Sequence, residues 1–382
     1  MIDDDYRPLE ETRSFGPGAA PASRPVSALE GPVPATGTES AAIIADALSV
    51  VTSSIEVMKS AETQPIPGAP APQRPTRPLG ESELQIFPLV LGGGGFERAV
   101  DDAESFAILD AYVGAGGNAV DVPGGLSAVH VEHVIGRWLH QRGARDEVVL
   151  STKVSSGDAA SSSSAADVTA AVDASLSRLA VEHLDILTFD TDDQSVPLEE
   201  SLTAADALVR AGKVRFLGAS GYTAERLMEA RVLAGQLILP RFVAVQVDYS
   251  LLARDEFERG IAPVAGAQGL AVLPTRVLGS GFLTGRYPGK RVERARVSPP
   301  RMADVAPHFT KRGLRIRSAV HEVARQQGVA PAAVALAWLK TKPFVTAPVV
   351  AASSREQIPD LLAAVNIHLT RSQVASLDKA SD

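Results

Sequence analysis

Eight short apolar runs, each followed by a run of helical periodicity, dominate the sequence from about residue 84 onward. The apolar runs span residues 87–91, 118–121, 147–152, 184–189, 214–219, 242–247, 270–273 and 344–350. The helical runs span residues 101–113, 129–141, 165–179, 198–211, 224–234, 256–268, 312–327 with 331–339, and 355–364. Short strands without an alternating polar face are typical of parallel sheets buried on both faces. Eight such units predict an α/β fold, a closed (β/α)8 TIM barrel.

A run of four glycines, Gly92 to Gly95, follows the first apolar run and bears on the alternative of an open doubly wound sheet. Such a sheet usually carries Gly-x-Gly-x-x-Gly after its first strand, because these glycines admit a dinucleotide pyrophosphate. This run lacks that spacing. A glycine run by itself indicates a close approach of two backbone segments or a loop, so it favours the barrel and is weak evidence for a nucleotide.

Residues 1–80 differ in composition from the rest, because they hold 12 of the 26 prolines together with many Ala, Ser and Gly residues. Such a segment buries too little apolar surface to offset its ordering entropy. We therefore expect a largely disordered N-terminal extension, with the barrel domain over 81–382. One stretch near 39–59 has no Pro or Gly, and its apolar residues recur at helical spacing, which predicts an amphipathic helix. The apolar stripe consists of Ile44, Leu48, Val51, Ile55 and Met58.

The predicted helix near 39–59 leaves two interpretations open. A tethered helix of about 20 residues has no partner of its own on which to bury an apolar stripe. In the first interpretation the helix packs on its own globular domain or stays nascent. In the second it docks on a protein partner or on a second copy of the chain.

Charge and composition exclude several classes of function. The net charge is −8 and no basic cluster occurs, so neither nucleic acid nor a membrane surface is an expected partner. The absence of cysteine removes disulfides, thiolate metal sites and Cys nucleophiles. No apolar run is long enough to span a bilayer, and the acidic start lacks the apolar core of a secretory signal, so we expect a cytoplasmic protein. The histidines show no paired spacing typical of a metal site.

Polar residues stand where several predicted strands end, and the carboxyl ends of barrel strands form the functional face. In chain order these residues are Asp121, Lys153, Asp190, Ser220, Gln246 and Arg276. A lysine between Asp121 and Asp190 suits an acid/base or Schiff-base centre. The same three residues equally suit a self-neutralising ion network, because buried charges are tolerated when they are paired.

Several motifs are spread along the predicted barrel in a fixed order. They are N-A-V-D at 118–121 with Gly136 downstream, S-T-K at 151–153, S-L-S-R-L at 175–179, L-D-I-L at 184–187, A-G-K-V-R-F-L-G-A-S at 211–220, V-Q-V-D-Y-S-L-L-A-R at 245–254 and L-G-S-G-F-L-T-G-R-Y at 278–287. In these motifs the chain resembles the aldo-keto reductase family, over roughly residues 84–381. The resemblance implies a (β/α)8 barrel and reduction of carbonyl compounds with NADPH.

The resemblance also implies a catalytic tetrad of Asp, Tyr, Lys and His. Asp121 and Lys153 match the Asp and the Lys. Leu126 stands at the Tyr position, five residues after Asp121, and Asp190 stands at the His position. Leucine has no proton to donate, and a carboxylate opposes a developing alkoxide. The catalytic residues carried over are therefore Asp121, Lys153 and Asp190, in a degenerate tetrad.

The resemblance implies NADP as the cofactor. We expect no metal ion. The residues that match its binding pattern are Ser220, Gln246, Leu278, Ser280, Gly281 and Leu283. Other positions differ from the family pattern: Thr275 replaces the aromatic residue that stacks on the nicotinamide, Ser353 replaces the basic residue for the 2′-phosphate, and Leu361 replaces the Asn for the adenine. The sequence therefore leaves NADP binding open.

Three functions follow from these observations. The first is a non-reducing pseudoenzyme or accessory subunit, which acts through a protein partner or self-association at the helix near 39–59. The second is a repurposed enzyme in which Lys153, Asp121 and Asp190, with His130 near the barrel mouth, carry out non-redox acid/base chemistry on a small-molecule ligand. The third is an NADPH-dependent oxidoreductase that reduces a carbonyl.

Overall fold

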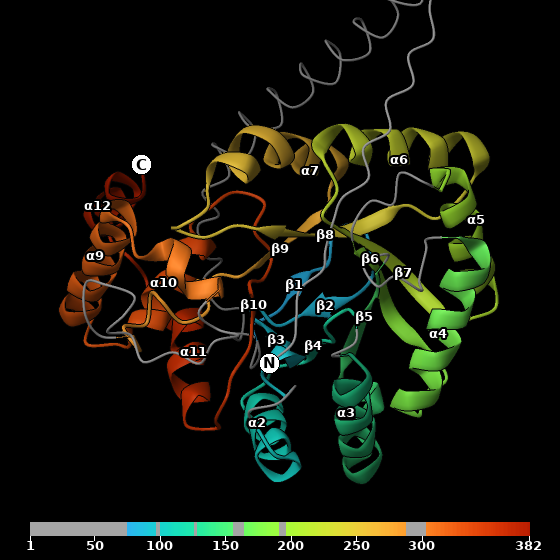
Figure 1. Cartoon of the computed structure of the whole chain (residues 1–382), viewed down its shortest axis with the longest axis horizontal. Helices are drawn as coiled ribbons and strands as arrows, with labels where there is room; N and C mark the ends of the chain where they lie inside the picture. Colours follow the sequence, from blue (N-terminus) through green and yellow to red (C-terminus); the bar gives the residue numbers. More distant parts are fainter. Residues whose placement is uncertain (1–74, 97–99, 126–127, 156–163, 191–195, 288–302) are drawn as a thin grey trace, which may run out of the picture. The chain divides into compact units, whose positions relative to one another are not determined.

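Eight parallel strands form one sheet that closes on itself (Figure 1). The computed structural model describes residues 75–96, 100–125, 128–155, 164–190, 196–287 and 303–382. The strand order is β10-β3-β4-β5-β6-β7-β8-β9. A parallel bridge between Val272 and Val345, with the amide of Thr346 donating to the carbonyl of Val272 at 2.9 Å, joins β9 to the segment before β10. The predicted (β/α)8 barrel is confirmed. The strands are β3 Val90–Gly92, β4 Ala119–Asp121, β5 Val149–Ser155, β6 Leu184–Asp190, β7 Val214–Ser220, β8 Phe242–Asp248, β9 Ala271–Thr275 and β10 Val349–Val350.

Helices cover the outside of the sheet (Figure 1). They are α2 Asp102–Gly114, α3 Ala128–Arg142, α4 Ala165–Leu179, α5 Leu198–Arg210, α6 Ala224–Leu237, α7 Ala262–Gln268, α9 Lys311–Gln327, α10 Pro331–Lys340, α11 Gln357–Asn366 and α12 Arg371–Ser381. Side-chain caps begin several of them: Asp101, Ser164, Thr223, Thr310 and Thr370 each accept a hydrogen bond from a main-chain amide in the first turn. Short 3-10 helices lie at Gly93–Gly95 (η1), Arg145–Glu147 (η2) and Ala306–His308 (η5), and a π-helix lies at Phe257–Ile261 (η3).

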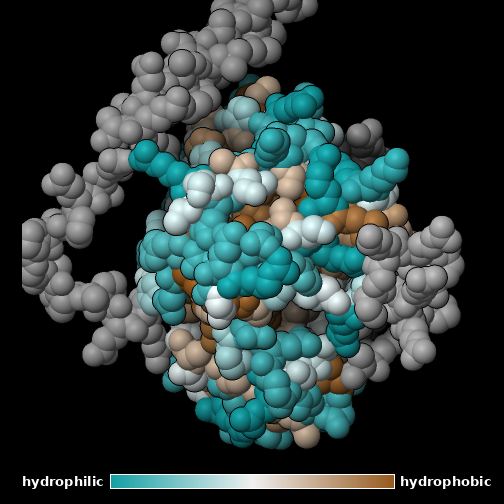
Figure 2. Space-filling model, turned by 90° about the vertical axis from the view of Figure 1, so that its left-hand side faces the viewer, coloured by the Kyte–Doolittle hydropathy of each residue, from teal (hydrophilic) through white to brown (hydrophobic). Residues whose placement is uncertain are grey.

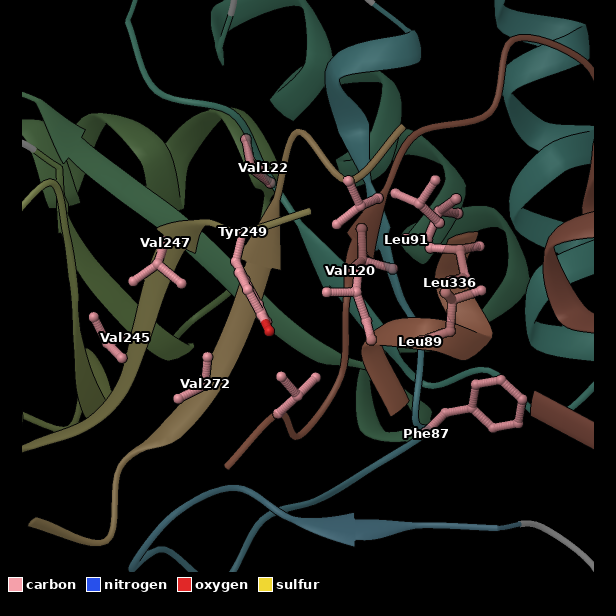
Figure 3. Packing of buried hydrophobic residues seen from close by; sticks show 14 of the residues in the cluster. Phe87, Leu89, Leu91, Val120, Val122, Val245, Val247, Tyr249, Val272 and Leu336 are labelled. Atoms are coloured by element: carbon pink, nitrogen blue, oxygen red, sulfur yellow. The ribbon is translucent and has the colours of Figure 1, made fainter. Parts of the chain in front are cut away.

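Two apolar clusters hold the barrel together. The larger cluster lies between strands and helices, where Leu89 and Leu91 pack beside Leu336 of α10 (Figure 3). The smaller cluster fills the barrel interior and its members come from the strands and from the chain before β3. These members are Leu79, Leu84, Ile86, Val90, Ala119, Ile186, Val243, Ala244, Ala271, Leu273 and Ala347. The outer face that carries α9, α11 and α12 presents mainly hydrophilic residues (Figure 2).

An antiparallel hairpin closes the amino-terminal end of the barrel. Its strands are β1, Arg77–Pro78, and β2, Gln85–Ile86. Arg77 donates to the carbonyl oxygens of Val345 and Thr346, ahead of β10, at 2.9 and 3.1 Å. The open end of the barrel is therefore the one where the strands finish, as the argument from strand ends requires.

The hairpin strand β1 lies upstream of residue 81, where composition placed the start of the barrel domain, so the packed part of the chain includes Arg77. The predicted helix near 39–59, and most of the predicted extension, lie outside the described residues. In the described part of the chain, no helix is long and apolar enough to cross a bilayer.

Candidate active site

Asp121 and Lys153 form an ion pair at the carboxyl ends of β4 and β5. Asp121 lies opposite Ser151 in the register of these strands, and Lys153 is two residues farther along, on the same face of β5. Nζ of Lys153 lies 3.4 Å from Oδ2 of Asp121, and the two side chains are only 13% and 5% exposed. Gln246 of β8 donates through Nε2 to Oδ1 of Asp121 at 2.8 Å. Both charges are thus paired in a largely buried position, as the sequence predicted.

Asp190 has a different partner from the one expected. It ends β6, and its Oδ1 accepts a hydrogen bond from Oγ of Ser220 at 2.6 Å. Within the described residues, the ion pair of Lys153 is with Asp121, and none joins Lys153 to Asp190. The register explains this, because Lys153 lies opposite Thr188, two residues before Asp190. The prediction of a lysine held between two carboxylates is therefore wrong on the Asp190 side.

Arg276 is neutralised by a carboxylate on the neighbouring strand. Its Nε lies 2.6 and 2.7 Å from the two oxygens of Asp248, the last residue of β8. This hydrogen bond raises the pKa of the Arg276 guanidinium. The adjacent Thr275, at the position of the stacking aromatic, donates its hydroxyl to the carbonyl of Val247 at 3.1 Å. The side chain that ends β9 is thus bonded to the main chain, and the one that follows it is bonded to Asp248.

The turn after β9 contains several residues with a left-handed backbone conformation. Four of its residues have positive φ: Gly279 at 55°, Ser280 at 53°, Gly281 at 89° and Gly285 at 79°. Leu283 is buried, Leu278 is half-buried, and Tyr287 donates its hydroxyl to the carbonyl of Ser280 at 3.1 Å. His308 packs beneath the turn, against Phe282, and its burial lowers its pKa. The turn is fixed from below, with Ser280 and Gly281 on its outer side.

Arg286 is a candidate site residue that the sequence analysis missed. Its Nη1 lies 3.5 Å from Oγ of Ser353, which follows β10. Gln357 holds Ser353 in place with two hydrogen bonds. The main-chain N–H of Ser353 donates to Oε1 of Gln357 at 3.0 Å, and Nε2 of Gln357 donates to Oγ of Ser353 at 3.1 Å. The sequence showed no basic residue at position 353 itself; the fold supplies a guanidinium from another loop. The only signal in the sequence was the position of Arg286 within the L-T-G-R-Y motif.

The glycine run serves close packing. A Cβ at Gly95 would lie 2.0 Å from the carbonyl oxygen of Ala352, and one at Gly93 would lie 2.6 Å from a methyl group of Val131. Gly92 ends β3, and Gly93–Gly95 form η1 between the end of β10 and α3. The glycines let the first loop pass between these elements, which is the close backbone approach that the sequence indicated.

Two other predicted residues remain to be placed. Leu126 lies outside the described residues, and His130 is exposed in the first turn of α3. No group of three or more His, Asp or Glu side chains in the described part of the chain is arranged to hold a metal ion.

Comparison with known proteins places the chain in one family. The aldo/keto reductase family model matches residues 88–382. Protein tas of Escherichia coli is 30% identical over 339 residues, which cover 78% of this chain and 95% of that protein. Norsolorinic acid reductase stcV of Emericella nidulans is 30% identical over 334 residues, covering 81% and 83%. The uncharacterized oxidoreductase YrpG of Bacillus subtilis is 29% identical over 306 residues, covering 77% and 91%. The chain therefore belongs to the aldo/keto reductase family.

Proposed function

We propose that the chain is an NADP(H)-dependent oxidoreductase that reduces a small carbonyl compound. Family membership and the names of its relatives, among them a norsolorinic acid reductase, support the reaction class. The observation that carries the proposal is the ion pair of Asp121 and Lys153, held at 3.4 Å at the mouth of the barrel. The positive-φ turn that follows β9, with Arg286 after it, offers further candidate contacts for a cofactor.

The residues present fit the phosphate end of the cofactor. The positive-φ turn around Ser280 and Gly281 has the backbone shape that cradles a pyrophosphate, and Arg286 with Ser353 offers a guanidinium and a hydroxyl to a further phosphate group. The nicotinamide end departs from the family pattern, because Ser220 is committed to Asp190. When bound, NADPH supplies a hydride.

The proton comes from Lys153 in this proposal. Leu126 has no acidic proton, whereas the Lys153 ammonium group carries three and keeps a small exposed face. Lys153 would donate one of these protons to the carbonyl oxygen of the substrate. Asp121 holds the amine in place through the ion pair.

NADPH titration followed by steady-state kinetics tests this function. We expect NADPH fluorescence to report saturable binding. We expect Lys153→Met to lower kcat by about 10²–10⁴-fold, the usual contribution of a positioned acid, with little change in NADPH affinity. Lys379→Met, an exposed lysine on α12, is the matched control and should leave both unchanged. Absence of NADPH binding at high micromolar concentration rules out the proposal.

A second function, a non-reducing binding protein, is favoured by one observation. Asp190 stands where the resemblance places the carbonyl-polarising His, and Ser220 holds it there at 2.6 Å. In this reading the predicted helix near 39–59 docks a partner chain. Wild-type protein would then bind NADPH without turnover, and the combined Leu126→Tyr and Asp190→His variant would gain it. Turnover by the wild type, lost in Lys153→Met, excludes the second function.

A further inference from the structure

Gln246 lies across the barrel from Asp121 and binds it directly. Its Nε2 donates to Oδ1 of Asp121 at 2.8 Å, while Oδ2 of the same carboxylate lies 3.4 Å from Nζ of Lys153. β8 carries the glutamine and β4 the aspartate, so the bond crosses the interior of the barrel. The carboxylate is held from two sides, by an amide and by an ammonium group.

The partner of the Gln246 amide determines its orientation. An ionised carboxylate only accepts hydrogen bonds, so the NH2 group must face Asp121. Turning the amide by half a rotation would set two acceptor oxygens against each other. Oε1 of Gln246 therefore points away from Asp121. It is fully buried there and meets no donor within the described part of the chain.

Ser151 provides a second buried polar atom in the same place. Its Oγ also has no hydrogen-bond partner among the residues that the structure describes. Ser151, Gln246 and Asp121 line one cavity of about 10 Å³, whose other walls are mainly apolar and include Leu79 and Ile86 of the hairpin. A cavity of this size accommodates one water when polar groups line it. Two buried polar atoms left unpaired would each destabilise the fold.

We propose that this cavity binds one structural water, and that Gln246 is a positioning residue for Asp121 and, through it, for Lys153. The water accepts a hydrogen bond from Oγ of Ser151 and donates one to Oε1 of Gln246. The resemblance places this glutamine among the cofactor-binding residues, whereas its N–H is committed here to Asp121. Neither the water site nor the positioning role of Gln246 needs a bound cofactor. Both can therefore be tested independently of the proposed function.

Crystallography of the full chain, at a resolution that shows ordered water, tests the binding site. In the wild type we expect one density peak within hydrogen-bond distance of both Ser151 Oγ and Gln246 Oε1. Ser151→Val should fill the cavity with a methyl group and remove the peak, while Ser151→Ala should leave room for it. A wild-type cavity without density, or a Gln246 amide turned away from Asp121, overturns the water site.

Lysine acetylation at one fixed pH, measured by mass spectrometry, tests the positioning role. We expect Gln246→Leu to accelerate the labelling of Lys153 several-fold. Lys340, whose ammonium group is bound to main-chain carbonyl oxygens, reports global opening, and the exposed Lys379 reports reagent strength; neither should change. An unchanged acetylation rate at Lys153, or an equal increase in the acetylation rate at Lys340, overturns the positioning role. If Gln246→Leu does not fold, Ser151→Val should still accelerate the acetylation of Lys153. An unchanged acetylation rate in that variant also overturns the role.

Discussion

Replacing Arg286 with Gln should separate binding of NADPH from binding of NADH. The guanidinium lies 3.5 Å from the Ser353 hydroxyl and is exposed. A hydrogen bond to a charged group contributes about 1.5–3 kcal/mol, and a solvent-exposed ion pair about 0.2–1 kcal/mol. An intermediate contribution of about 1.4 kcal/mol corresponds to a tenfold change in Kd. We therefore expect Arg286→Gln to weaken NADPH binding roughly tenfold, with NADH almost unaffected because it lacks the additional phosphate.

Fluorescence titration with both cofactors, at low and high salt, measures this effect. Because the contact is exposed, the NADPH preference of the wild type should shrink as salt shortens the screening length from about 10 Å at 0.1 M to about 3 Å at 1 M. Arg210→Gln is the matched control, since Arg210 is an exposed arginine on α5 paired with Asp206. Equal losses for NADPH and NADH, or the same loss in the control, would refute the assignment of Arg286 to a phosphate.

Three further predictions concern stability. Burial lowers the pKa of His308 from 6.5, so the unfolded chain binds a proton that the folded chain refuses, and stability should fall as pH drops below 6.5. His308→Gln should flatten the pH dependence of the thermal midpoint between pH 7.5 and 5.5 in scanning calorimetry, and an unchanged slope contradicts this. Arg178→Met leaves the carboxylate of Glu132, which is 1% exposed, without its cation. We expect the free energy of unfolding in urea to fall by about 3–5 kcal/mol. A fall of less than about 1 kcal/mol would show that the pair is dispensable. Gly95→Ala places a Cβ 2.0 Å from a carbonyl oxygen, whereas Gly94→Ala meets nothing within 4 Å; the first should cost about 1–3 kcal/mol and the second close to nothing, and equal effects would contradict the packing argument.

The alternation of apolar and helical runs was enough to predict the architecture, because each strand and helix carries its own local signal. The helix predicted at 165–179 coincides with α4, which Ser164 caps and which ends at Ala180 with positive φ. The last strand is much shorter than the predicted run 344–350. Phe344 has a φ of 68° and Pro348 has no N–H to donate, so the run forms a strand only at Val349–Val350, with a single bridge at Val345.

Two helical details escaped the sequence analysis. The predicted helix 256–268 begins as the π-helix Phe257–Ile261, and Pro263 in the first turn of α7 has no N–H for an ordinary helical bond. Helix α12 was not predicted, although Thr370 and Gln373 form a capping box that the sequence already contained.

Only those site residues that lie at the ends of individual strands could be predicted from the sequence. Asp121 ends β4 and Lys153 lies two residues before the end of the neighbouring β5, so their contact follows from the fold. Pairing of Lys153 with Asp190 failed because the register between β5 and β6 sets how far along the barrel each side chain lies. The contact between Arg286 and Ser353 joins two loops that are 67 residues apart in sequence. Such a contact depends on where two turns meet in space, which residue spacing does not encode.

The closing seam of the barrel has a consequence for how the molecule opens. β6 and β7 are joined through six residue pairs, whereas β10 meets β3 through two and the segment at Val345 meets β9 through one bridge. The contact of the Val345 segment with β9 is therefore the weakest main-chain pairing in the described sheet, and we expect partial unfolding to start there. Arg77 of the hairpin binds the carbonyl oxygens of Val345 and Thr346, which lie on one side of this contact. We therefore expect amide protons in this segment to exchange with solvent faster when Arg77 is replaced.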